Sequence, residues 1–209
     1  MSEKEEALLR RVVDGLKDIG GVIGVVLGGS RARGTAGPDS DYDIGVYYDD
    51  EVSLDLDRLD KAAEALDDER RNGLVAPPGA WGKWVNGGGW LVVDGRHVDL
   101  LLRDMGRVEQ AVDDCLAGNV QPHYQNGHHH AYINTMYGGE LAISRVLRDR
   151  DGRLAAARCR MFPYPEALRR ALGRPLEFEA GVALGLARAT AGRHADYHGA
   201  GQGGRGHSL

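Results

Sequence analysis

One strand-and-turn pattern limits what this chain can fold into more than any other feature. The segment Val22–Leu27 is apolar, rich in β-branched residues and free of charge, which is typical of a buried central strand. The run Gly28-Gly29-Ser30 follows directly and predicts a tight turn into a short helix. A second strand is expected over residues 41–48, and it starts with Asp41-Tyr42-Asp43. The pattern therefore combines a glycine-serine turn with a pair of carboxylates.

This combination suits a metal-bound phosphate compound. Asp41 and Asp43 are two residues apart, so their carboxylates project from one face of a strand and can share Mg²⁺ ions, which prefer such oxygen ligands. The start of the short helix presents free backbone N–H groups to a phosphate, and Gly29 lets the phosphate come close. Ser30 is expected to cap this helix. We interpret the pattern as a site for a metal–nucleotide complex.

A hairpin further along the chain offers a third carboxylate. Apolar strands are predicted over residues 90–93 and 96–102, and Asp94-Gly95 between them is a favoured two-residue turn. Asp99 lies inside the second strand, where a carboxylate is costly to bury unless it is paired or binds a metal. The alternative is that Asp99 lies near a strand end and faces water.

Other residues near these motifs keep two interpretations open. Arg31 and Arg33 follow the turn, and either guanidinium could contact a phosphate or face solvent. His123 and the run His128-His129-His130 could bind a transition metal or be solvated in a loop. Three tryptophans could stack on a base or pack beside the hairpin: Trp81, Trp84 and Trp90.

The periodicity of apolar residues divides the chain into three parts. Residues 1–118 alternate predicted helices and strands and are expected to form an α+β core. Residues 119–191 are expected to form a helical appendage, with helices over 132–144, 152–160, 165–172 and 175–191. Residues 192–209 are rich in Gly and His, cannot supply a core and are expected to be disordered.

The turn Gly29-Ser30 followed by Asp41 and Asp43 resembles the signature of the nucleotidyltransferase superfamily that includes DNA polymerase beta and the antibiotic nucleotidyltransferases. The resemblance covers residues 22–103. It implies a small mixed sheet flanked by helices, and phosphate contacts from the turn. It also implies that two Mg²⁺ ions are held by Asp41, Asp43 and Asp99, and that Asp99 helps to deprotonate the acceptor.

The resemblance implies an enzyme that moves a nucleoside monophosphate, most often AMP, from a nucleoside triphosphate to a hydroxyl and releases pyrophosphate. A small molecule such as an aminoglycoside or lincosamide antibiotic is the favoured acceptor, because the chain is longer than the minimal family members. Those minimal members adenylylate a partner toxin, so a protein acceptor is the first alternative. A nucleotide-binding protein without turnover is the second.

Composition restricts the setting of such an activity. The net charge of −5 over 209 residues argues against a general nucleic-acid binder. No apolar run reaches transmembrane length, and the polar N-terminus does not resemble a signal peptide, so no membrane partner is expected. The chain holds only two cysteines, Cys115 and Cys159, which favours a reducing cytoplasm over an oxidising compartment.

Overall fold

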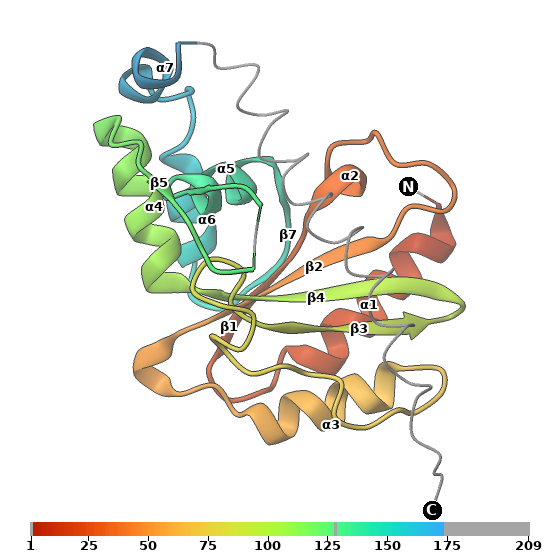
Figure 1. The fold of residues 1–209 in the computed structure, drawn as a ribbon. Coiled ribbons are helices and arrows are strands. Elements are labelled where there is room, and N and C mark those ends of the chain that lie inside the picture. Colours follow the sequence, from red (N-terminus) through yellow and green to blue (C-terminus); the bar gives the residue numbers. More distant parts are fainter. Residues whose placement is uncertain (1, 128, 174–209) are drawn as a thin grey trace, which may run out of the picture.

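A five-stranded mixed sheet organises the computed structural model, which describes residues 2–127 and 129–173 (Figure 1). The strand order is β3-β4-β2-β1-β7, with β2 and β4 parallel and the other neighbours antiparallel. The five strands are β1 (Val22–Leu27), β2 (Tyr42–Tyr48), β3 (Gly88–Val93), β4 (Arg96–Asp104) and β7 (Arg145–Asp149). The α+β fold with a small mixed sheet flanked by helices, expected from the sequence, is thus confirmed.

Helices cover both faces of this sheet. They are α1 (Glu3–Leu16), α2 (Gly29–Ala32), α3 (Leu56–Leu66), α4 (Met105–Ala117), α5 (Met136–Ile143), α6 (Arg153–Cys159) and α7 (Glu166–Leu172). A short 3₁₀ turn spans Asp50–Val52, and a small separate ladder pairs β5 (Pro122–His123) with β6 (Tyr132–Ile133). None of the helices in the described part of the chain has the length and apolar character needed to cross a membrane.

Local sequence signals account for several element boundaries. The predicted capping box starts α1, because the Ser2 hydroxyl accepts from the Glu5 N–H while the Glu5 carboxylate accepts from the Ser2 N–H. The hairpin between β3 and β4 turns at Asp94 and Gly95, both with positive φ, as its sequence indicates. Gly118 ends α4 in the left-handed conformation.

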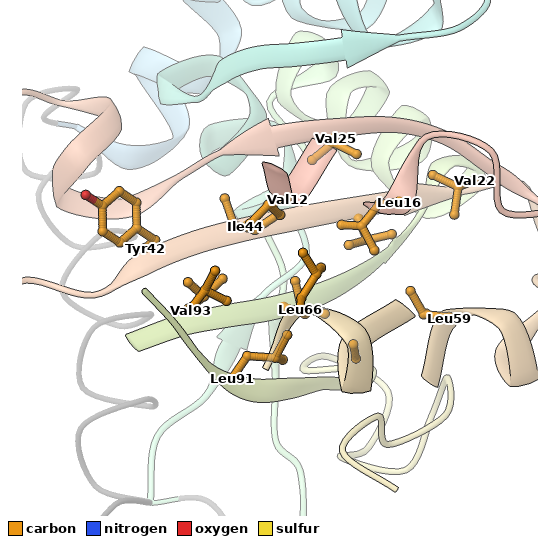
Figure 2. Packing of buried hydrophobic residues seen from close by; sticks show 14 of the residues in the cluster. Val12, Leu16, Val22, Val25, Tyr42, Ile44, Leu59, Leu66, Leu91 and Val93 are labelled. Carbon is orange, nitrogen blue, oxygen red and sulfur yellow. The ribbon is translucent and has the colours of Figure 1, made fainter. Parts of the chain in front are cut away.

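One face of the sheet packs against α1 and α3 through apolar side chains. Figure 2 shows Val12 and Leu16 of α1 and Leu66 of α3 close to Ile44 of β2. These side chains are at most 5 % exposed. Residues two apart along a strand share a face, so alternate residues of β2 and β4 supply this core: Tyr42, Ile44, Val46, Tyr48, Val98, Leu100 and Leu102.

The opposite face packs against α4, α5, α6 and α7. Its core includes Val108 and Val112 of α4, Leu141 of α5 and Tyr47 of β2. The same face also carries the buried polar side chains of Asp99 and Arg103, and Glu140 of α5 is buried against it.

The region after residue 130 contains a strand where the sequence predicts only helices. Within the expected helix 132–144, α5 occupies only Met136–Ile143, and β7 follows it and pairs with β1 at the edge of the sheet. Arginines and an aspartate dominate β7, so no apolar alternation marks it as a strand. The helix expected over 175–191 and the tail 192–209 lie outside the described residues, and the division at residues 118 and 191 stays a prediction.

Candidate active site

The strand pairing arranges the predicted site residues in one row across the sheet. Asp43 of β2 is paired in register with Asp99 of β4, and Asp99 is paired with Trp90 of β3. Beyond β2, the Gly28 N–H donates to the Asp43 carbonyl oxygen at 2.7 Å. Paired residues on neighbouring strands project to the same face. We call these four neighbouring positions across the sheet, in the order Trp90, Asp99, Asp43 and Gly28, the site row.

The glycine turn is shaped by the carboxylate beside it. Gly29 has φ +58°, and a Cβ atom at this position would lie 1.8 Å from Oδ2 of Asp43. Only glycine tolerates both the backbone conformation and this approach. Gly28 is the N-cap of α2, and Ser30 lies inside the helix without a side-chain capping bond. The prediction that Ser30 caps the helix is therefore wrong, and its hydroxyl is not used in capping.

The two arginines after the turn have different environments. Arg31 pairs with Glu5 at 2.7 Å, donates to the carbonyls of Ser40 and Asp41, and lies 3.8 Å from the ring centroid of Tyr42. Through these contacts Arg31 fixes the loop that leads to Asp41. Arg33 is exposed, and its charge acts on Asp43. Of the two, Arg33 keeps the freedom to contact a phosphate.

The position of Asp43 disfavours the ionised form of its carboxyl. Burial raises the pKa of its carboxyl to about 6, and the negative charges of Glu140 and Asp41 act in the same direction. The charges of Arg103 and Arg33 oppose the rise without cancelling it. A carboxylate held among other carboxylates in this way is a candidate for binding a cation.

The other two predicted carboxylates lie close to Asp43 along the chain or in the sheet. Asp41 is half-buried just before β2, and its charge is among those that raise the pKa of Asp43. Asp99 is 2 % exposed, so the alternative that it faces water at a strand end does not hold. The topology thus brings Asp43 and Asp99 to one face of two adjacent strands, and Asp41 directly precedes the first of them.

A buried ion pair near this face was missed by the sequence interpretation. Arg103 of β4 is 1 % exposed and donates through Nε to both carboxylate oxygens of Glu140 of α5, at 3.0 and 3.1 Å. Burial alone would lower the pKa of Arg103, but the charge of Glu140 raises it overall. The signal that could have found Arg103 is its place in the alternation Asp99, Leu101, Arg103, which continues the polar face of the strand.

The donor types fit a divalent cation, although the side chains are not gathered as a metal centre. Among residues 2–127 and 129–173, no group of three or more His, Cys, Asp or Glu side chains is placed to hold a metal ion. Asp41 and Asp43 supply the carboxylate oxygens that Mg²⁺ prefers, and a cation would relieve the penalty on Asp43. His123 instead stacks on Trp84, with ring centroids 4.6 Å apart, and His128 lies outside the described residues.

Comparison with known proteins places this site in a family. Residues 9–104 match the family model described as a nucleotidyltransferase domain, whereas a comparison with curated proteins found no match. The matched segment starts within α1 and ends at the last residue of β4, so it contains the glycine turn, Asp41, Asp43 and Asp99. Residues 9–104 therefore form a nucleotidyltransferase domain, consistent with the DNA polymerase beta type, and the protein is a transferase.

Proposed function

We propose that this protein is a magnesium-dependent nucleotidyltransferase that moves a nucleoside monophosphate, with AMP favoured, from a nucleoside triphosphate to a hydroxyl of a small molecule. The observation that carries this proposal is the site row, in which Asp99 and Asp43 lie in register beside the glycine turn. The matched family and the sequence resemblance both favour nucleotidyl transfer at this place.

The reaction forms one bond and breaks one. The acceptor hydroxyl oxygen attacks the α-phosphorus, the bond from that phosphorus to the oxygen bridging to the β-phosphate breaks, and pyrophosphate leaves with that bond's electron pair. The hydroxyl proton passes to a carboxylate beside the acceptor, for which Asp99 is our candidate, and from there to solvent. In-line displacement of this kind gains most of its rate from positioning and charge stabilisation.

Each residue of the site has a proposed task. The backbone N–H groups at Gly29 and Ser30 hold the β- and γ-phosphates, and Arg33 adds a positive charge at that end. Asp41 and Asp43 would hold two Mg²⁺ ions together with Asp99. When bound, these ions neutralise phosphate charge and lower the pKa of the attacking hydroxyl.

We favour a small molecule as the acceptor and the cytoplasm as the compartment. The described chain continues beyond the matched domain through α4 to α7, which gives the protein more structure than the minimal members of the superfamily. Both cysteines are free, which supports a reducing compartment. A protein acceptor is distinguished by label transfer from α-labelled ATP to a co-expressed protein and to no small molecule.

The test compares nucleotide binding and turnover in two Asp→Asn variants. Thermal shifts are measured with ATP, GTP, CTP and UTP, with and without Mg²⁺, and pyrophosphate release is measured with hydroxylated acceptors. Asp43→Asn should lower the rate about 10³-fold, because it removes a cation ligand that contributes several kcal/mol. Asp39→Asn makes the same chemical change at an exposed position of the preceding loop and should leave both measurements unchanged.

Two results would contradict the proposal. Full pyrophosphate release by Asp43→Asn would exclude the mechanism. Magnesium-dependent nucleotide binding without pyrophosphate release for any acceptor would instead favour a nucleotide-binding protein without turnover.

A further inference from the structure

The site row ends in a pair of stacked tryptophans. Trp90 follows Asp99 in the row, on the strand farthest from the glycine turn. The ring of Trp81 lies against it, with centroids 4.6 Å apart and planes 22° from parallel. Both side chains are half-buried, so each indole keeps part of its ring surface exposed. Trp81 packs against the core on the α4 side of the sheet, and both indoles keep exposed surface that a ligand can reach.

Buried and partly buried hydrogen bonds hold the loop that carries Trp81. The Trp81 N–H donates to the Asn86 carbonyl at 2.9 Å, and the Gln125 side chain donates to the Trp81 carbonyl at 2.9 Å. The Asn86 amide is itself buried and donates to the Tyr48 hydroxyl at 3.0 Å and to the Leu102 carbonyl at 3.2 Å. The loop is therefore anchored to the sheet and presents Trp81 in one position.

Consecutive glycines bring this loop against the sheet. A Cβ at Gly88 would lie 1.9 Å from the Leu100 carbonyl oxygen and 3.0 Å from the Trp81 ring. A Cβ at Gly89 would lie 2.6 Å from the Leu74 carbonyl oxygen. Glycine alone permits these close approaches. The two glycines therefore let the loop lie against β3, with the Trp81 ring stacked on Trp90, whose side chain shares a face with Asp99.

The direction of the row indicates what the tryptophans face. In an in-line displacement, the attacking oxygen and the leaving pyrophosphate lie on opposite sides of the α-phosphorus, while the ribose oxygen is equatorial. With pyrophosphate at the Gly29-Ser30 turn and the α-phosphate over Asp43, the attacking hydroxyl lies towards Asp99. The nucleoside, attached through the equatorial ribose oxygen, extends to the side of the site row. The position of Trp90, next to Asp99 in the row, is therefore left for the acceptor.

We propose that the stacked pair of Trp81 and Trp90 forms the wall of the acceptor subsite and selects an acceptor whose hydroxyl is carried by a saturated, sugar-like ring. Such a ring offers C–H groups, or ammonium groups where it is aminated, to the face or edge of an indole. This inference rests on the proposed nucleotidyl transfer and adds to it the residues that choose the acceptor.

The test separates nucleotide binding from acceptor binding. The dissociation constant of Mg·ATP is measured by calorimetry, and the acceptor KM by pyrophosphate release with methyl glucoside, glucosamine and kanamycin as probes. Trp81→Ala should leave the Mg·ATP constant within twofold and raise the acceptor KM about tenfold, as the loss of an aromatic contact does. Trp81→Phe, which keeps a ring, should restore most of the affinity. Trp84→Phe, whose parent indole stacks on His123 outside the row, is the matched control and should change neither.

Tryptophan fluorescence measures acceptor binding without turnover and with both Trp81 and Trp90 still present. In the Trp84→Phe background the remaining indoles are Trp81 and Trp90. Their emission should change when a ring acceptor is added to the Mg·ATP complex. A change with Mg·ATP alone, or an equal loss of Mg·ATP affinity in Trp81→Ala, would assign the pair to the base instead.

The remaining outcomes are also decisive. An unchanged acceptor KM in both Trp81 variants would show that the pair is only structural. A wild-type protein that binds Mg·ATP but transfers to none of the ring acceptors would exclude the proposed acceptor class while leaving nucleotidyl transfer intact. Absence of Mg²⁺-dependent binding of ATP, GTP, CTP and UTP by the wild type would contradict the proposed function itself.

Discussion

The two faces of the sheet are built from the same strands and serve different ends. On β2 and β4, Ile44 and Leu100 face α1 and α3 and are at most 1 % exposed in an apolar core. Their neighbours Asp43 and Asp99 face the other way, towards the helices that follow β4. One residue of strand register therefore separates side chains that stabilise the fold from side chains that cost stability.

The difference shows how a nucleotidyltransferase domain can hold carboxylates in its interior. Burying an unpaired charge is expensive, and the raised pKa of Asp43 records that cost. The apolar face offsets it through the packing of α1 and α3 (Figure 2). The charged face should therefore be sensitive in activity, and the apolar face in stability.

The largest effect on stability is expected at the buried ion pair. Glu140→Gln leaves Arg103 buried without its counter-charge, which should lower the free energy of unfolding by about 3–5 kcal/mol. The double variant Arg103→Met with Glu140→Leu removes both charges and should recover most of this loss. Chemical denaturation measures all three proteins, and an unchanged Glu140→Gln would mean that the pair is solvated.

The next largest effect tests the apolar face. Ile44→Ala removes a fully buried side chain from the core against α1, so the free energy of unfolding should fall by about 3 kcal/mol. Well below its melting temperature the variant should keep Mg·ATP affinity within twofold. Loss of nucleotide binding in the folded variant would show that the two faces are not separable.

A glycine substitution should act on the charged face with little cost elsewhere. Gly29→Ala places a methyl group against the Asp43 carboxylate, and we expect pyrophosphate release to fall about 10²-fold as the carboxylate is displaced. Gly95→Ala has a similar positive φ at the hairpin turn, with no heavy atom within 4 Å of its Cβ. It reports backbone strain alone, so equal activities of the two variants would contradict the role of the close approach.

The smallest effect is a pH-dependent change in stability. The folded-state pKa of Asp43, about 6, lies above the ordinary value of 3.8 for an aspartate, so in the absence of Mg²⁺ its ionisation lowers stability as pH rises between these values. Asp43→Asn should match the wild type near pH 4 and exceed it by about 2 kcal/mol at pH 7, because a shift worth about 3 kcal/mol is reduced by solvent screening of this half-buried carboxyl. Saturating Mg²⁺ should reduce the difference, and an advantage that persists at pH 4 would point to packing instead.

Much of the core domain could be predicted from local patterns. Val22–Leu27 reads as a buried strand, Ser2 and Glu5 mark the start of α1, and Asp94-Gly95 fixes the hairpin, because each depends on neighbours in the chain. The strand β7 was not predictable in this way. Its charged residues lie at the sheet edge, where the backbone N–H and C=O groups of β1 that do not pair with β2 form hydrogen bonds with β7.

The site divides along the same line. Residue type and short-range spacing are enough to identify the glycine turn, the pair Asp41 and Asp43, and Asp99 as a candidate third carboxylate. Three further features become visible only in the folded chain: Arg31 pairs with Glu5, Glu140 is the partner of Arg103, and Trp81 stacks on Trp90 at the end of the site row. The partners of Arg31 and Arg103 lie 26 and 37 residues away in the chain, and the place of the tryptophan pair beside Asp99 depends on the register of β3 on β4. Short-range sequence patterns therefore cannot reveal any of these contacts.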